Sequence, residues 1–204
     1  CGIKDWMKDE ETRYIVLLYK TDKFEGIVTS SEEGDVFWLT LDEMKQRKLA
    51  YGMDKMLEVF LNDNISEYFF FEENAKEFEV DILFKNDDFV FSYRVGGILI
   101  RNGKILLQRP KNDDYSIIGG HVAAMETSIE TLKREFEEEL HTKIEVDNLL
   151  AIGEIYFPWG KRPCHQICLY YNVHLVNYDI PLDGVFHGYD GLDDKRIDLD
   201  FCWV

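Results

Sequence analysis

Two glutamates, Glu138 and Glu139, lie three and four positions after a third, Glu135. On an α-helix these spacings bring side chains together on one face. Like charges this close destabilise an isolated helix, whereas Mg²⁺ binds carboxylate oxygens and commonly bridges them to phosphates. The spacing therefore indicates either a solvated acidic helix face or a divalent-cation site.

The segment that carries these glutamates has the pattern of a capped amphipathic helix over residues 128–140. Thr127 and Glu130 have the spacing of a capping box, in which a hydroxyl and a carboxylate bond the first backbone amides of the helix. The apolar stripe that would face a core consists of Ile129, Leu132, Phe136 and Leu140. Because the acidic patch lies beside this stripe, the helix would hold the glutamates at the edge of a core.

A β-hairpin is predicted before this helix, and further strands are predicted after it. Residues 95–100 and 104–108 form the two strands of this hairpin, and Asn102-Gly103 supplies the positive φ angles of a two-residue turn between them. Strands are also expected at residues 143–145, 151–157 and 166–175. Residues 177–196, which are rich in Asp and Gly, are expected to form a long loop. These strands would give the helix a sheet to pack on.

From Gly120 onward the sequence resembles the Nudix box, a glycine–loop–helix motif over residues 120–142. The identical positions are Gly120, Glu126, Arg134, Glu135, Glu138 and Glu139, and Phe136 fills the bulky apolar position. Two positions depart from the motif, since His141 stands where the family has glycine and Thr142 where it has an aliphatic residue. That glycine lets the chain leave the helix with a positive φ, so the departure concerns the helix end rather than the acidic patch.

The resemblance implies an α+β fold for residues 88–204, a Nudix-type mixed sheet sandwiched by helices, with the chain stopping before the last helix of the family. It also implies an enzyme, a pyrophosphohydrolase acting on a nucleoside diphosphate derivative or an oxidised nucleoside triphosphate. The alternative is a Nudix-fold module that senses a nucleotide without cleaving it.

The resemblance also implies a site that uses Mg²⁺ or Mn²⁺. The implied metal ligands are Glu135, Glu138, Glu139 and the Gly120 carbonyl. Arg134 would hold Glu135 by a charge-assisted hydrogen bond. The residue that deprotonates the attacking water varies across the family, and its candidates here are one of the three glutamates or an acidic residue within 179–200.

Three further residues are candidates for contacting the substrate. Arg109, at the end of its strand, could reach a phosphate, while Tyr156 and Trp159 could stack on a base. A surface role for Arg109 and core packing for the two aromatic residues remain open alternatives. His121 and His141 could ligate a metal, although histidines near a hard-cation site are more often structural.

Residues 1–84 lack the box and resemble, less specifically, the second half of a MutT-like 8-oxo-dGTP diphosphatase. This resemblance rests on residues 2–6, 13–21, 30–34 and 53–64. Strands are expected at residues 14–19 and 36–39, a capping box at Thr40 and Glu43, and a helix along the apolar face of Met53, Met56, Leu57, Phe60 and Leu61. We therefore expect a partial Nudix-like lobe before the boxed domain, a window cut from a tandem pair, with residues 41–62 docked on the boxed domain's sheet.

The composition bounds the class of partner. The 204 residues include 40 acidic and 23 basic ones, for a formal net charge of −17. An acidic surface repels nucleic-acid backbones and anionic membranes, but it admits a phosphorylated small molecule when a metal ion lies between carboxylate and phosphate. The small-molecule nucleotide as partner is what the resemblance implies. The four cysteines lack the spacing of a zinc or redox motif and predict free thiols in a reducing cytoplasm. The sequence leaves a homodimer open.

Overall fold

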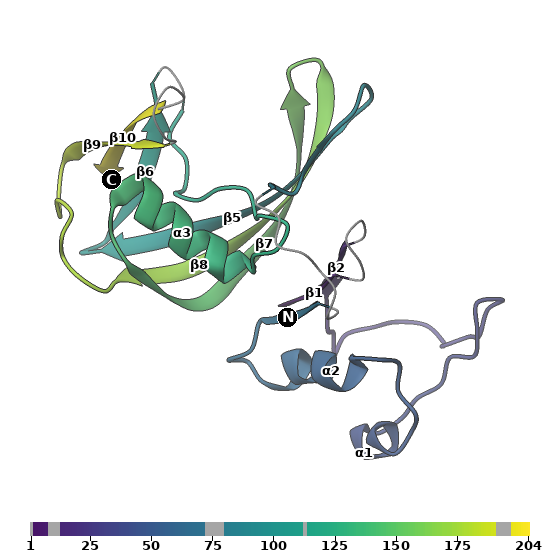
Figure 1. The fold of residues 1–204 in the computed structure, drawn as a ribbon. Coiled ribbons are helices and arrows are strands. Elements are labelled where there is room, and N and C mark those ends of the chain that lie inside the picture. The colour runs from purple at the N-terminus through teal and green to yellow at the C-terminus, as the bar shows by residue number, and fades with distance from the viewer. Residues whose placement is uncertain (1, 8–12, 72–79, 112–113, 191–196) are drawn as a thin grey trace. The chain divides into compact units, whose positions relative to one another are not determined.

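The computed structural model describes residues 2–7, 13–71, 80–111, 114–190 and 197–204 (Figure 1). The chain forms two compact units, Cys1–Ala75 and Lys76–Val204. The sequence places the boundary within the polar segment 73–88, between lobes of residues 1–84 and 88–204. The chain pairs with the second unit at Ile82. The Ile82 amide donates to the Val122 carbonyl at 2.8 Å, and the Ile82 carbonyl accepts from the Tyr93 amide at 3.1 Å.

The first unit combines a small sheet with helices. Its strands are β1 (Gly2–Met7), β2 (Arg13–Leu18) and β3 (Glu67–Phe71), in the order β2-β1-β3, with β2 antiparallel and β3 parallel to β1. Its helices are α1 (Leu41–Lys45) and α2 (Met53–Leu61). The predicted capping box of Thr40 and Glu43 starts α1. α2 packs on β1 and β3, with Val59 only 3% exposed.

Two features of the first unit differ from the sequence prediction. Residues 36–39 form no strand in the described part of the chain, and Trp38 is 70% exposed, so the β-rich composition of this segment is not matched by a pairing strand. The strand at β2 is confirmed, but it is an edge strand with Tyr14 and Val16 exposed rather than a buried one. The buried polar group beside it is Asp5, whose carboxylate accepts from Arg13 Nε at 2.7 Å.

The second unit is built on a mixed sheet. Its strands are β4 (Leu83–Lys85), β5 (Val90–Arg101), β6 (Lys104–Pro110), β7 (Ile144–Trp159), β8 (Arg162–Leu175), β9 (Val185–Asp190) and β10 (Ile197–Trp203). They lie in the order β7-β8-β5-β6-β10-β9, with β4 beside β5, and β5 and β8 run parallel while the other pairs are antiparallel. The predicted α+β class with a mixed sheet is confirmed.

The predicted hairpin and helix of this unit are also confirmed. β5 and β6 meet at Asn102 and Gly103, which adopt φ angles of 50° and 76°. α3 (Ser128–Leu140) starts at the capping box of Thr127 and Glu130 and lies across one face of the sheet (Figure 1). Leu132 and Phe136 on α3 are fully buried.

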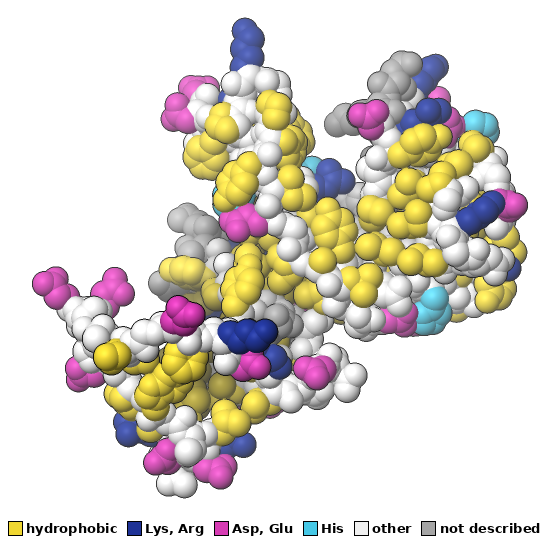
Figure 2. All heavy atoms as spheres, turned by 180° about the vertical axis from the view of Figure 1, so that it is seen from behind, with side chains coloured by type: hydrophobic (Ala, Val, Ile, Leu, Met, Phe, Trp, Pro, Cys, Tyr) yellow, Lys and Arg dark blue, Asp and Glu magenta, His cyan; other side chains and the backbone are white. Residues whose placement is uncertain are grey.

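Hydrophobic side chains gather on the face of this unit that is turned away from α3, as Figure 2 shows from behind. The docking of residues 41–62 on the sheet stays a prediction.

Two predictions about the strands after α3 need correction. Residues 177–196 are not one long loop, because β9 lies inside this range and pairs with β10, with the Phe186 ring 5.4 Å from the Phe201 ring. The two strands predicted within 143–157 are a single strand, β7, whose register shifts between Val146 and Ala151. Cys164, Cys168 and Cys202 are free thiols. Within the described residues, no helix has the length and apolar character needed to cross a membrane.

Candidate active site

A cleft of about 730 Å³ lies between α3 and the segment that precedes it. Its lining includes all five residues that the sequence assigned to metal binding or its support, namely Gly120, Arg134, Glu135, Glu138 and Glu139. The remaining lining residues are Asp81, Arg94, Gln108, Pro110, Asp114, Tyr115, Ser116, Gly119, His121, Ile197 and Leu199. The fold therefore brings the acidic patch of α3 to a space large enough for a small molecule.

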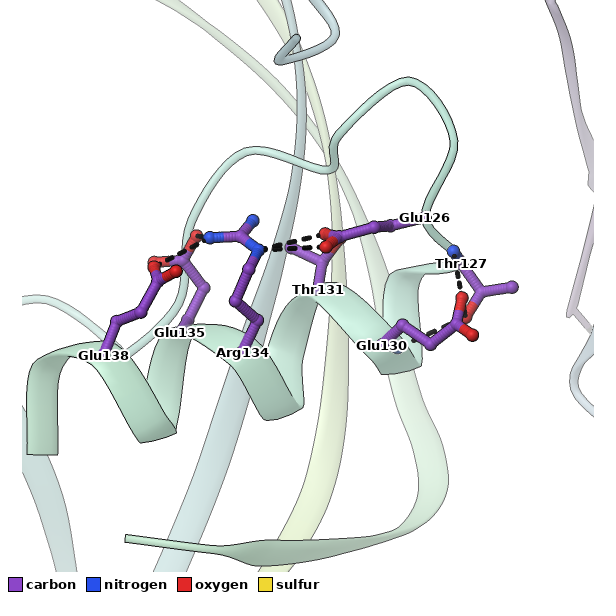
Figure 3. Close-up of polar contacts among 7 residues, drawn as sticks. All are labelled: Glu126, Thr127, Glu130, Thr131, Arg134, Glu135 and Glu138. Carbon is purple, nitrogen blue, oxygen red and sulfur yellow. Dashed lines mark hydrogen bonds and ion pairs between the residues drawn. The ribbon is translucent and has the colours of Figure 1, made fainter. Parts of the chain in front are cut away.

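Arg134 connects the carboxylates of this patch (Figure 3). Its Nε lies 3.1 Å from both oxygens of Glu126. Its Nη1 lies 2.9 Å from Glu138 Oε2 and 3.1 Å from Glu135 Oε1. Thr131 Oγ1 in turn donates to Glu126 Oε2 at 2.8 Å. One guanidinium thus offsets the repulsion among three carboxylates, which explains how α3 tolerates the patch.

The charge of Arg134 is favoured by these neighbours. Burial by itself would lower the pKa of Arg134, but the carboxylates of Glu135, Glu126 and Glu138 outweigh that effect and raise the pKa above its usual range. The guanidinium therefore remains a cation and supplies a counter-charge to the carboxylates around it.

The three glutamates differ in their access to solvent. Glu135 is 9% exposed and Glu139 is 4% exposed, whereas half of the Glu138 side chain is exposed. Glu135 lies directly against Gly120, where a Cβ atom would come within 2.2 Å of Glu135 Oε1. The carboxylate therefore occupies the space that any other residue at position 120 would fill. The Gly120 carbonyl accepts from the Val95 amide at 3.0 Å.

The carboxylates do not converge on a common point in this arrangement. Among the described residues, no three His, Cys, Asp or Glu side chains are grouped closely enough to hold a metal ion. The reason is visible in the contacts of Arg134, which holds Glu135 and Glu138 on its guanidinium. The oxygen donors are nevertheless all of the hard type that Mg²⁺ and Mn²⁺ prefer.

The two departures from the Nudix box are accommodated at the end of α3. His141 adopts the left-handed conformation, with φ 53° and ψ 34°, so this position does require a positive φ. Its ring packs edge-on against Tyr189 at 5.2 Å. Thr142 is 1% exposed, and its hydroxyl donates to Asp179 Oδ1 at 2.5 Å, which satisfies the hydroxyl that replaces an aliphatic group.

The lining of the cleft also contains polar residues that sequence reasoning did not assign to substrate binding. Gln108 is 6% exposed, and His121 follows Gly120 directly. Burial and, to a smaller extent, the nearby Arg94 guanidinium lower the pKa of His121 to about 4. Arg94 Nη2 donates to the Gly119 carbonyl at 3.0 Å. The available signal for Gln108 was a polar residue at an inward position of a strand, two residues after the buried Leu106.

The fold does not bring the predicted substrate residues to this cleft. Arg109 pairs with Asp200 at 3.4 Å and lies over the Tyr115 ring. Tyr156 is 68% exposed on β7 and stacks on His165. Trp159 ends β7 beneath Lys85. None of these three is among the described residues that line the cleft. Tyr156 and Trp159 lie on β7, at the opposite edge of the sheet from β10, whereas Arg109 lies on β6 between two lining residues, Gln108 and Pro110.

Asp200, one of the candidate bases within 179–200, is likewise not among the described residues that line this cleft. Asp200 Oδ1 lies 2.5 Å from His187 Nδ1, and this hydrogen bond is the main cause that lowers the pKa of Asp200. Both residues line a second cleft of about 530 Å³, together with His141 and Tyr189. Residues 191–196 lie outside the described residues.

Comparison with known proteins supplies one family match. A family model described as NUDIX domain matches residues 91–197, whereas a search of curated proteins finds no match. An ADP-ribose pyrophosphatase from Streptococcus suis is 15% identical over 54% of this chain and 72% of that protein, with a TM-score of 0.38. A MutT protein from Methanosarcina mazei is 19% identical over 59% and 80%, with a TM-score of 0.38. The residues that the family model matches contain α3 and its three glutamates.

Proposed function

The chain belongs to the Nudix family and is a Nudix pyrophosphohydrolase, and from this premise we propose that it hydrolyses the diphosphate bond of a nucleoside diphosphate derivative with Mg²⁺ or Mn²⁺. The observation that carries the proposal is the single cleft that contains Gly120, Arg134 and the three glutamates of α3. An oxidised nucleoside triphosphate, such as 8-oxo-dGTP, is the second candidate substrate, and it contains the same type of bond.

The proposed cation ligands are the carboxylates of Glu135, Glu138 and Glu139 and the carbonyl of Gly120. The close approach of Glu135 to Gly120 supports this set, since a Cβ at position 120 would collide with the carboxylate. The Gly120 carbonyl bonds Val95 through one lone pair and keeps a second for a cation. When bound, a divalent cation neutralises the diphosphate and lowers the pKa of a water molecule.

Arg134 has a positioning role in this proposal. Its Nε is held by Glu126, which Thr131 orients in turn, so that Nη1 is left to bond Glu135 and Glu138. The guanidinium offsets the repulsion between these two carboxylates before any cation arrives. Offsetting this repulsion lowers the cost of holding like charges on one face of α3.

The proton of the attacking water needs an acceptor, and Glu138 is the best placed of the three glutamates. Its side chain is half exposed, whereas Glu135 and Glu139 are buried. A carboxylate that reaches solvent can bond a water that enters the cleft and take its proton. An acidic residue within 179–200 is the other candidate for this role.

The experiment that tests the proposal is a nucleotide panel with Mn²⁺. The wild-type chain is incubated with nucleoside diphosphate sugars, dinucleoside polyphosphates, nucleoside triphosphates and 8-oxo-dGTP, and release of nucleoside monophosphate or phosphate is measured with and without chelator. We expect cation-dependent release from at least one class. Tight nucleotide binding without turnover on any member would contradict the proposal and identify a nucleotide-sensing module instead.

A further inference from the structure

Two buried polar atoms belong to side chains that line the same cleft as the glutamates of α3. Oε1 of Gln108 and Nε2 of His121 have no hydrogen-bond partner among the residues that the structure describes. Gln108 is 6% exposed, and the His121 side chain is 16% exposed. Because a buried acceptor without a partner destabilises a folded protein, such atoms in a cleft indicate a ligand that completes their bonding.

Both residues are held on rigid backbone next to the proposed cation ligands. The Gln108 amide donates to the Ser116 carbonyl at 2.9 Å, and the Ser116 amide donates back to the Gln108 carbonyl at 2.8 Å. His121 follows Gly120 and bridges to Arg94 on β5. The two side chains line the same cleft as Glu135, so a substrate whose diphosphate lies at the glutamates can reach them with its adjoining group.

The charges of the cleft limit what that adjoining group can be. Its lining carries five acidic residues, Asp81, Asp114, Glu135, Glu138 and Glu139, against the two cations Arg94 and Arg134. Arg134 already bonds three carboxylates. A phosphate oxygen without a proton has nothing to donate to Gln108 Oε1, whereas this carboxamide oxygen accepts a hydrogen bond from a hydroxyl or an amine.

We propose that Gln108 and His121 are specificity-determining residues that bind an uncharged, hydroxyl-bearing group attached to the diphosphate. A sugar hydroxyl donates to Gln108 Oε1, and a neighbouring hydroxyl bonds His121 Nε2. The enzyme accordingly favours a nucleoside diphosphate joined to a sugar over a nucleoside triphosphate. This inference rests on the proposed function, because it takes the diphosphate to lie at the glutamates.

The test compares ADP-glucose with ATP in the wild type, Gln108→Leu and His121→Phe. Gln166→Leu is the matched control, because Gln166 is a glutamine on β8 that bonds Ser92 and is not among the described residues lining the cleft. We measure kcat and KM for both nucleotides with Mn²⁺, the dissociation constant of each nucleotide by calorimetry without metal, and the melting temperature without ligand.

We expect Gln108→Leu to weaken ADP-glucose binding about tenfold and to raise KM by a similar factor, the effect of losing one hydrogen bond. The dissociation constant and KM of ATP should change by no more than about twofold in this variant. The ligand-free melting temperature should rise, because leucine removes a buried acceptor that lacks a partner. His121→Phe should give the same selective loss, and Gln166→Leu should give none.

Equal losses for ADP-glucose and ATP, or a lower melting temperature with unchanged ADP-glucose binding, would overturn the inference. So would wild-type protein that binds ATP as tightly as ADP-glucose. The calorimetric comparison needs no turnover. A chain that hydrolyses neither nucleotide would thus count against the proposed function, while its binding preference still decides the inference.

Discussion

Replacing Arg134 by glutamine removes the one guanidinium that contacts Glu126, Glu135 and Glu138. The variant keeps a polar side chain with good helix propensity, so the helix itself should persist. What it loses is the counter-charge of the acidic patch. We expect the second unit to be markedly less stable in metal-free buffer and to recover part of that stability when Mg²⁺ or Mn²⁺ is added.

The size of the loss depends on how exposed each pair is. The Glu138 pair involves a half-exposed carboxylate and contributes about 0.5 kcal/mol, as exposed ion pairs do. The Glu126 pair, with about a third of each side chain exposed, contributes about 1 kcal/mol. Glu135 is nearly buried, and leaving it without Arg134 costs roughly 2 kcal/mol, below the range for a fully buried pair. The total of about 3.5 kcal/mol lowers the melting temperature by roughly 10–15 °C for a unit of this size.

Thermal melting followed by circular dichroism, with and without divalent cation, measures this effect. Lys133→Gln is the matched control, because Lys133 sits beside Arg134 on α3 and its bond to Glu145 joins two exposed side chains. The control should change the melting temperature by no more than about 2 °C. The reasoning is refuted if Arg134→Gln melts like the control, or if saturating Mn²⁺ raises its melting temperature no more than that of the wild type.

Three further predictions address the helix end, pH and Gly120. His141→Gly should raise stability by about 0.5–1 kcal/mol in a denaturant titration, because glycine relieves the left-handed strain at φ 53° while losing the Tyr189 contact; a loss of stability would contradict this. The folded-state pKa of His121 is about 4, below its unfolded value near 6.5, so the unfolded state takes up the proton first as the pH falls. The melting temperature should therefore fall between pH 6.5 and pH 4, and it should fall less in His121→Phe. Equal slopes of melting temperature against pH in both proteins would exclude His121 as the cause. Gly120→Ala should lower kcat about a hundredfold, because the new Cβ displaces Glu135, and near-normal turnover would show that Glu135 is not needed there.

Short-range signals in the sequence predicted the elements that carry the site. The capping box of Thr127 and Glu130 and the turn at Asn102-Gly103 act within a few residues, so they require no knowledge of the rest of the fold. The apolar stripe of α3 and the glutamate spacing follow from helix geometry alone. For this reason the predicted metal-site residues could be placed on one helix and its preceding loop.

Features that depend on distant partners were harder to predict. β9 lies in a segment rich in Asp and Gly, and it exists because it pairs with β10 and stacks Phe186 on Phe201. Residues 36–39 have a β-rich composition but form no strand in the described part of the chain. β-Structure of this kind is decided by the neighbouring strand rather than by local propensity.

The residues that line the cleft were hard to predict for the same reason, because they come from segments that are distant in the sequence. Gln108 and His121 lie 13 positions apart, and they meet in one cleft because the segment around Ser116 folds back along β6. A polar residue at an inward position of a strand indicates a site, but the local sequence does not predict which other residues line that site. Arg109, Tyr156 and Trp159 were chosen by residue type. In the structure their side chains contact Asp200, His165 and Lys85, respectively.

The central claim is that the glutamates of α3 hold a divalent cation that the hydrolysis needs. Its most direct test is a Mn²⁺ titration, read as bound cation and as turnover of the best panel substrate, for the wild type, Glu138→Gln, Glu139→Gln and the control Glu137→Gln. Glu137 lies on the same helix, is exposed and does not line the cleft. We predict that Glu138→Gln and Glu139→Gln stay folded, weaken Mn²⁺ binding and abolish turnover, while Glu137→Gln behaves like the wild type. Folded Glu138→Gln and Glu139→Gln proteins that bind Mn²⁺ and turn over substrate normally would contradict the claim.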